Sequence, residues 1–95
     1  MTVDRFRASL DAEAPPDGLS QPLLALWHAG RGEWDAAHGV AQADKSAEAA
    51  WVHAHLHRIE GDLNNAGYWY RRAGRAQSEA DIPQEWAEIV AALQA

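Results

Sequence analysis

The sequence predicts an all-α fold, in which about six helices form a right-handed antiparallel helical array within one domain, residues 1–95. Ala, Leu, Glu, Gln and Arg, which favour helices, dominate the composition, whereas Val, Ile and Thr, which favour strands, are sparse. Capping residues, glycines and prolines recur at intervals that suit short helices. A 29-residue repeat also relates two central segments, as in folds built from stacked helical units.

Prolines and glycines delimit the first three predicted helices. The first spans about residues 3–13 and ends before the proline pair at positions 15 and 16, which cannot continue it. Ser20 is expected to cap a second helix that extends to about Ala29. The segment GRG is expected to end this helix, and a third helix is predicted over residues 33–43.

The next two helices are expected to form a second hairpin. The fourth begins after its cap Ser46 and ends next to Gly61. The fifth begins at Asp62 or Asn64 and ends at Gly74, a residue suited to a helix C-terminus.

A final helix is predicted over about residues 82–94. Asp81 and Gln84 have the spacing of a capping box at its start. One apolar stripe runs along the helix, formed by Ile82, Trp86, Ile89, Val90 and Leu93. We therefore expect this helix to cover the open end of the preceding helices.

The repeat aligns residues 23–37 with residues 52–66 without a gap. Its matched positions are Ala25 with Ala54, His28 with His57, Gly32 with Gly61, Glu33 with Asp62, Trp34 with Leu63, and Ala37 with Ala66. Repeats of about this length are usually supersecondary units that bury their apolar faces against each other.

This pattern resembles the tetratricopeptide (TPR) helix-turn-helix. The second unit carries the family's small, turn and aromatic positions at Ala54, Gly61, Leu63, Ala66, Tyr70 and Ala73. The first unit departs at Ala41 and Asp44, and the 29-residue period is shorter than the family's period of about 34. The resemblance covers roughly residues 21–75. It implies two TPR-like hairpins, about 21–43 and 46–74, between an N-terminal flanking helix and a C-terminal capping helix.

The string HLHRIEGDLNNAGYWYRRAG, residues 55–74, also resembles a group of small bacterial proteins that have no assigned function. This resemblance implies relatives and no mechanism. The sequence contains no nucleophile elbow, phosphate-binding loop or dinucleotide fingerprint. These absences favour a protein that is not an enzyme, although residues that meet only in space need no local motif.

The composition excludes several classes of function. A net charge of −6 and a pI near 5.2 argue against nucleic acid as a partner. The absence of cysteine rules out disulfides and thiolate chemistry. The sequence has no apolar run near the roughly 18 residues of a membrane span, and its first residues lack the apolar core of a signal peptide. We therefore expect a cytoplasmic protein.

The alternating histidines His53, His55 and His57 do not form one cluster on a helix. Successive residues differ by about 100° on a helical wheel. His53 and His57 lie on one flank of the apolar stripe together with Glu60, whereas His55 lies on the other flank beside Trp51. His55 is therefore expected to be a half-buried spacer.

His53 and His57 have a spacing that can place two imidazoles on one metal ion. Zinc needs at least one further protein ligand, and Glu60 is the nearest candidate. The alternatives are Asp62, His28, Glu33 and Asp35. Because such histidine pairs are frequent and the repeat favours packing roles for His28 and His57, no metal or cofactor is expected, and His53, His57 and Glu60 remain weak candidates. His38, in the third predicted helix, carries no functional signal.

Glu60 and Asp62 flank the hairpin glycine and have the composition of an acid–base pair. Asp62 is equally suited to cap the following helix, and Glu33 occupies the same place in the first unit. The capping interpretation is favoured over catalysis by this pair.

The segment YWYRRAGR, residues 68–75, combines aromatic and basic side chains. Residues 76–95 carry four acids and no base, so the arginines at positions 71, 72 and 75 are expected to pair with them. The alternative is a site for an acidic peptide or a small anion. There, Arg72 and Arg75 would make bidentate contacts, while Tyr68 or Trp69 would stack.

The leading hypothesis is a protein- or ligand-binding module with a polar–aromatic groove, lined by the first helices of the hairpins. The alternative is a small enzyme or a divalent-metal-binding protein that uses His53, His57 and Glu60. A homo-oligomer is a further hypothesis. The candidate contact residues are Trp27, His53, His57, Glu60, Tyr68, Trp69, Arg72 and Arg75.

Overall fold

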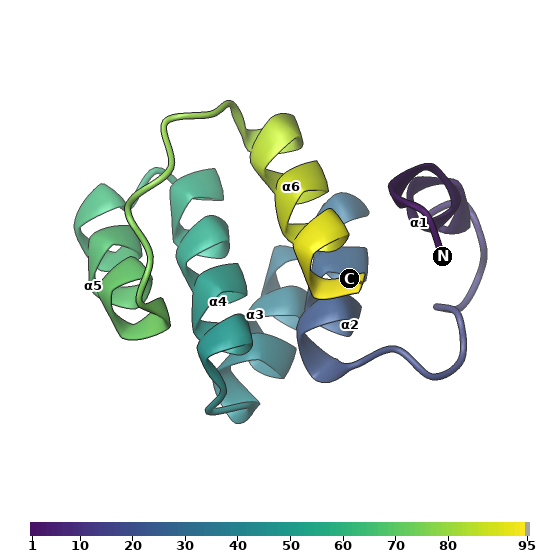
Figure 1. The fold of residues 1–95 in the computed structure, drawn as a ribbon. Coiled ribbons are helices and arrows are strands. Elements are labelled where there is room, and N and C mark those ends of the chain that lie inside the picture. Colours follow the sequence, from purple (N-terminus) through teal and green to yellow (C-terminus); the bar gives the residue numbers. More distant parts are fainter. Residues whose placement is uncertain (95) are drawn as a thin grey trace.

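The computed structural model describes residues 1–94, and the all-α fold predicted from the sequence is confirmed (Figure 1). The described chain contains six helices and no strand: α1 (Val3–Ser9), α2 (Gln21–Gly30), α3 (Trp34–Ala43), α4 (Ala47–Ile59), α5 (Leu63–Ala73) and α6 (Ile82–Gln94). Within these residues, no helix combines the length and the apolar character that crossing a membrane requires.

Helix α4 is the central element of the array. It packs against α5 in one hairpin, against α2 and α3 of the other hairpin, and against α6 (Figure 1). Every residue from Val52 to His57 is consequently buried. Because neighbours surround this helix, each of its flanks meets a different environment.

The two hairpin turns have nearly the same geometry. Gly32 and Gly61 adopt φ values of +76° and +83°, in the left-handed region that glycine enters without steric cost. The next amide closes each turn: Glu33 N donates to His28 O at 3.0 Å, and Asp62 N donates to His57 O at 2.9 Å. The 29-residue repeat in the sequence therefore corresponds to a repeated turn in the structure.

Side-chain caps start four of the helices at the places that the sequence predicts. Each cap oxygen accepts a backbone N–H of the first turn, which has no partner within the helix. The pairs are Ser20 with Leu23 at 3.4 Å, Ser46 with Ala49 at 3.1 Å, Asp62 with Asn65 at 3.2 Å, and Asp81 with Gln84 at 2.8 Å.

The first helix is shorter than predicted, since α1 ends at Ser9 rather than near residue 13. The guanidinium of Arg31, just after α2, donates to the carbonyls of Leu10 and Ala12, both at 2.7 Å. These carbonyls thus obtain partners from another part of the chain, and the backbone turns away towards α2 without forming further helix.

Helix α6 packs across α2 and α4 instead of covering an open end of the array (Figure 1). Ile89 and Val90 are fully buried, and Trp86 Nε1 donates to Leu26 O of α2 at 2.8 Å. The face that the first helices of the two hairpins share is therefore covered by α6. Trp27, expected to line a groove on these helices, is only 2% exposed and lies in the core.

The backbone positions of Gly61 and Gly39 predict opposite effects of alanine substitution on stability. Gly61→Ala should lower the free energy of unfolding by about 1–2 kcal/mol, because alanine is strained at positive φ. Gly39→Ala should raise it by about 0.5–1 kcal/mol, because Gly39 lies inside α3 and an added Cβ would meet nothing within 4 Å. Urea unfolding followed by tryptophan fluorescence measures both. Equal effects of the two substitutions would contradict the turn assignment.

Candidate metal centre

Three histidines from two helices meet beside α4. His53 and His57 lie one turn apart on α4, and His38 of α3 completes the group. One ligand nitrogen from each residue lies within 4.8 Å of the other two. The ring centroids are 4.6 Å apart for His38 and His53, 4.9 Å for His53 and His57, and 5.6 Å for His38 and His57. We call this group the three-histidine cluster.

Trp34 fixes His38 in this position. Its indole Nε1 donates to the carbonyl of Leu56 at 2.7 Å, which ties the start of α3 to α4. The same indole stacks on His38, with centroids 4.8 Å apart and an interplanar angle of 10°. The imidazole on the next turn of α3 is thereby directed towards α4.

Trp69 of α5 encloses the cluster from another side. Its ring stacks on His53 at a centroid distance of 3.8 Å and an angle of 11°. His53 and His57 are 3% and 5% exposed, whereas His38 is half-buried. The cluster therefore meets solvent mainly through His38, and the tryptophans restrict the motion of the other imidazoles.

The environment of the cluster favours the uncharged imidazole at His53 and at His38. Burial, together with repulsion from positive charge on the neighbouring His38 and His57, lowers the pKa of His53 to about 4. Burial and the proximity of His57 also lower the pKa of His38. Near pH 7, His53 therefore keeps a nitrogen lone pair, which a metal ion requires of a histidine ligand.

Glu60 orients the third imidazole. Its Oε1 lies 2.6 Å from His57 Nδ1, and an ionised carboxylate can only accept a hydrogen bond, so Nδ1 carries the proton. Nε2 of His57 is then the nitrogen with a free lone pair. Metal-binding histidines are commonly held by a carboxylate in this way.

The donor set fits a transition-metal ion with an open coordination position. Tetrahedral zinc with Zn–N bonds of about 2.0–2.1 Å places its ligand nitrogens about 3.3 Å apart. The 4.8 Å limit within the cluster is larger than this, so small side-chain rotations would bring the nitrogens onto one ion. A second group, His57 with Glu60 and Asp62, satisfies the same distance limit, but it is more exposed and uses the carboxylate that orients His57.

The third histidine of the cluster, His38, is not among the further ligands that the sequence suggests. His28 and Glu33 pair with each other at 2.8 Å in the first hairpin, while Glu60 binds the ring of His57. His38 takes the place beside the predicted pair. Its position one turn after Trp34 on the same helix is a weak signal, since only the packing of α3 on α4 shows which imidazole it meets.

Tyr68, Trp69 and Arg72 form a separate surface group next to the cluster. Arg72 donates to the Tyr68 hydroxyl at 3.1 Å, and its guanidinium lies 5.2 Å from the Trp69 ring centroid. Arg75 does not belong to this group, because its guanidinium lies 3.5 Å from the ring centroid of Trp51. Trp69 is the residue that joins this surface to the three-histidine cluster.

The arginines do not pair as predicted. Among residues 1–94, no carboxylate oxygen lies within 4.0 Å of a guanidinium nitrogen of Arg71, Arg72 or Arg75. The partner of the acidic C-terminal segment is Arg58 of α4, whose NH1 donates to Glu85 at 2.7 Å and whose NH2 donates to the carbonyl of Ala80. Arg58 lies closer to α6 because it is on the helix against which α6 packs.

The expectation of a half-buried spacer at His55 is wrong, since His55 is fully buried. Its Nδ1 lies 2.7 Å from Glu85 Oε1, and the hydroxyl of Tyr70 donates to the other oxygen of Glu85. Burial alone would raise the pKa of Glu85, but hydrogen bonds from His55, Tyr70 and Arg58 lower it overall. The sequence signal for this network is a glutamate directly before Trp86 in the apolar stripe of α6.

The low pKa of His53 predicts a specific acid sensitivity. The unfolded chain binds this proton near pH 6.5 and the folded chain near pH 4, so between these values the unfolded state holds more protons and stability falls as the pH is lowered. Protonation of His53 should lower the free energy of unfolding by about 3 kcal/mol in total. His53→Phe, which keeps an aromatic ring against Trp69, should lose that much less between pH 6.5 and pH 4. Urea unfolding at several pH values measures the difference, and parallel curves would contradict it.

No family model, no curated protein and no solved structure matches this chain. The assignment of a function therefore depends on the chemistry of the chain's own residues.

Proposed function

We propose that this protein binds a divalent transition-metal ion through His38, His53 and His57. The observation that carries the proposal is the meeting of three imidazoles from α3 and α4, with one ligand nitrogen from each within 4.8 Å of the others. Imidazole nitrogen suits zinc, copper, nickel and iron, whereas magnesium and calcium prefer oxygen ligands. The proposal therefore concerns metals such as zinc, copper, nickel and iron.

The surroundings of the cluster support metal binding in two ways. Glu60 directs His57 by accepting from Nδ1, so Nε2 is the ligand atom. The low pKa of His53 keeps that imidazole neutral near pH 7, so a metal ion does not have to displace a proton from it.

Three histidine ligands leave one tetrahedral position for water or another molecule. Zinc sites that carry out hydrolysis have such an open position, whereas purely structural zinc sites have four protein ligands. The proposal covers binding of the ion and not a reaction. Among residues 1–94, its support consists of the three candidate ligands and the carboxylate that orients one of them.

Titration of the purified protein with Co²⁺ and Zn²⁺ tests the proposal. One equivalent of Co²⁺ should produce visible absorption bands of a tetrahedral site, and Zn²⁺ should displace it. His38→Ala, His53→Ala and His57→Ala should each weaken Zn²⁺ binding by more than about 100-fold, since each removes a ligand from the ion itself. His28→Ala is the matched control, because His28 occupies the repeat position of His57 and also pairs with a carboxylate.

Glu60→Gln gives a finer test of the same site. Loss of a carboxylate that orients a ligand typically weakens metal binding about 10–100-fold, and Glu60→Gln is expected to fall in that range. Circular dichroism would establish that each variant keeps its helices. Wild-type affinity in all three histidine variants would refute the proposal, as would failure of the folded wild-type protein to bind any of these metals.

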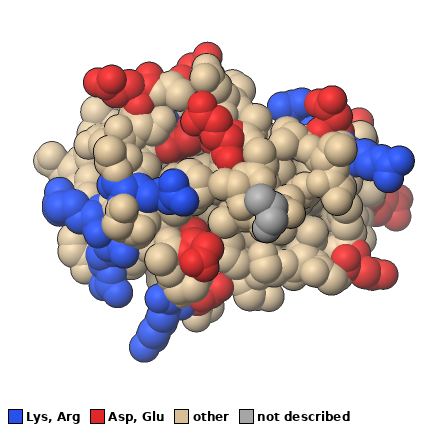
Figure 2. All heavy atoms as spheres, viewed as in Figure 1, with Lys and Arg blue, Asp and Glu red and all other residues tan. Residues whose placement is uncertain are grey.

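A second candidate function is the binding of an acidic peptide beside Trp69. A surface hollow of about 540 Å³ is lined by Lys45, Trp69 and Arg72, and also by Asp44, whose carboxylate accepts from Ser46 N. Figure 2 shows basic side chains gathered at the α5 end of the molecule. Arg72 stacks against Trp69 and has no ion-pair partner among the described residues, so its charge is available to a carboxylate.

A fluorescently labelled oligoglutamate peptide tests the second candidate. Arg72→Glu should reduce binding at least about tenfold, because it replaces attraction by repulsion at the hollow. Arg5→Glu, the same charge change at an exposed position of α1, should have a much smaller effect. Fluorescence polarisation at two salt concentrations measures both variants, and equal losses would exclude a specific site at Arg72.

A further inference from the structure

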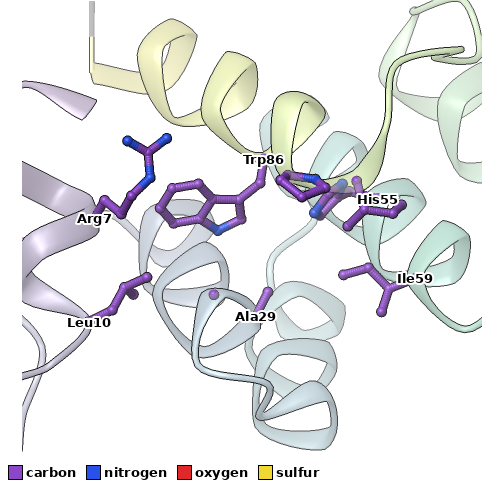
Figure 3. A pocket seen from close by; sticks show the side chains of 9 residues that line it. Arg7, Leu10, Ala29, His55, Ile59 and Trp86 are labelled. Carbon is purple, nitrogen blue, oxygen red and sulfur yellow. The ribbon is translucent and has the colours of Figure 1, made fainter. Parts of the chain in front are cut away.

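A second candidate site lies on the flank of α4 opposite the three-histidine cluster. A half-open pocket of about 340 Å³ is lined by residues of α1, α2, α4 and α6 and by Leu10 just after α1. Its walls are largely apolar and include Leu10, Ala29, Ile59 and Trp86 (Figure 3). Pockets that hold small organic molecules have volumes of about 300–1,000 Å³, apolar walls and a few fixed polar groups, and this pocket meets the first two conditions.

His55 supplies the fixed polar group. It lines the pocket beside Trp86 (Figure 3), and its side chain is 0% exposed. Nδ1 is bound to Glu85, but Nε2 has no hydrogen-bond partner among residues 1–94. A buried polar atom without a partner costs about 1–3 kcal/mol, and such atoms are rare in folded proteins. A ligand that moves the covering side chains aside and binds Nε2 from the pocket would remove this cost.

The neighbours of His55 determine what Nε2 can bind. Glu85 accepts from Nδ1, so the remaining nitrogen of a neutral imidazole is a hydrogen-bond acceptor. Arg58 already balances the charge of Glu85 at 2.7 Å, so a neutral His55 leaves the buried network without net charge. The ligand must therefore offer a hydrogen-bond donor.

The rim of the pocket indicates that the ligand is uncharged. Arg7 is its only charged lining residue, and its guanidinium lies 3.1 Å from Asp4 and 5.7 Å from the Trp86 ring centroid. Because Asp4 partly neutralises the charge of Arg7, the rim does not favour an anionic ligand. The indole of Trp86 suits an aromatic ring.

We propose that this pocket binds a small phenol, whose ring packs against Trp86 and Ile59 and whose hydroxyl donates to His55 Nε2. A phenol combines the apolar body, the aromatic face and the single donor that the pocket requires. This site shares no residue with the three-histidine cluster, so the proposal does not depend on metal binding.

A pair of matched ligands tests the hydrogen bond without any change to the protein. 4-Ethylphenol and its methyl ether, 4-ethylanisole, have similar shapes, but only the phenol has a donor. We expect the phenol to bind about tenfold more tightly, which is the effect of giving a buried acceptor its partner. Calorimetry measures both affinities, and the ¹⁵N resonance of His55 Nε2 should shift only with the phenol.

Two tryptophan substitutions test the location. Ile59→Trp should fill the mouth of the pocket and weaken phenol binding at least tenfold, since Ile59 lines the pocket and is 39% exposed. Leu63→Trp is the control, because Leu63 is 57% exposed and does not line it. Equal affinity for phenol and ether, equal effects of the two substitutions, or no saturable phenol binding to the wild-type protein would each overturn the proposal.

Discussion

The buried carboxylate of Glu85 is the interaction on which the arrangement of the C-terminal half depends. It accepts hydrogen bonds from His55 and Arg58 of α4 and from Tyr70 of α5. A buried charge that loses its partners typically costs about 3–5 kcal/mol, so α6 is stable only where Glu85 reaches all three. The apolar stripe of α6 alone would allow sliding along α2 and α4, whereas this network specifies one position.

The same network links the fold to the pocket beside Trp86. Because Glu85 holds Nδ1 of His55, the orientation of that imidazole is fixed, and Nε2 is left without a partner at the wall of the pocket. Burial and the hydrogen bond to Glu85 also raise the pKa of Tyr70, which keeps its hydroxyl protonated as a donor. One carboxylate thus positions both α6 and the imidazole at the wall of a largely apolar pocket.

Helix α4 separates two chemically different environments within five residues. Because successive residues point about 100° apart, His53 and His57 face α3 and α5 while His55 faces α6. The sequence predicts this division correctly, since it follows from helical geometry alone. It also predicts the caps and the turn at Gly61, which depend on residues that are close in the chain.

The sequence by itself determined the properties that arise within one helix or one turn: six helices, two equivalent hairpins, and the pairing of His53 with His57. Only the tertiary structure decided which side chains meet across helices. His38 joins the histidine pair because α3 packs on α4, and Glu85 reaches His55 because α6 lies across α2 and α4. The helical period sets the direction in which a side chain leaves its own helix. Which residue that side chain meets depends on how the helices pack and cross. That packing places Glu85, beside the apolar stripe of α6, against an imidazole thirty positions earlier.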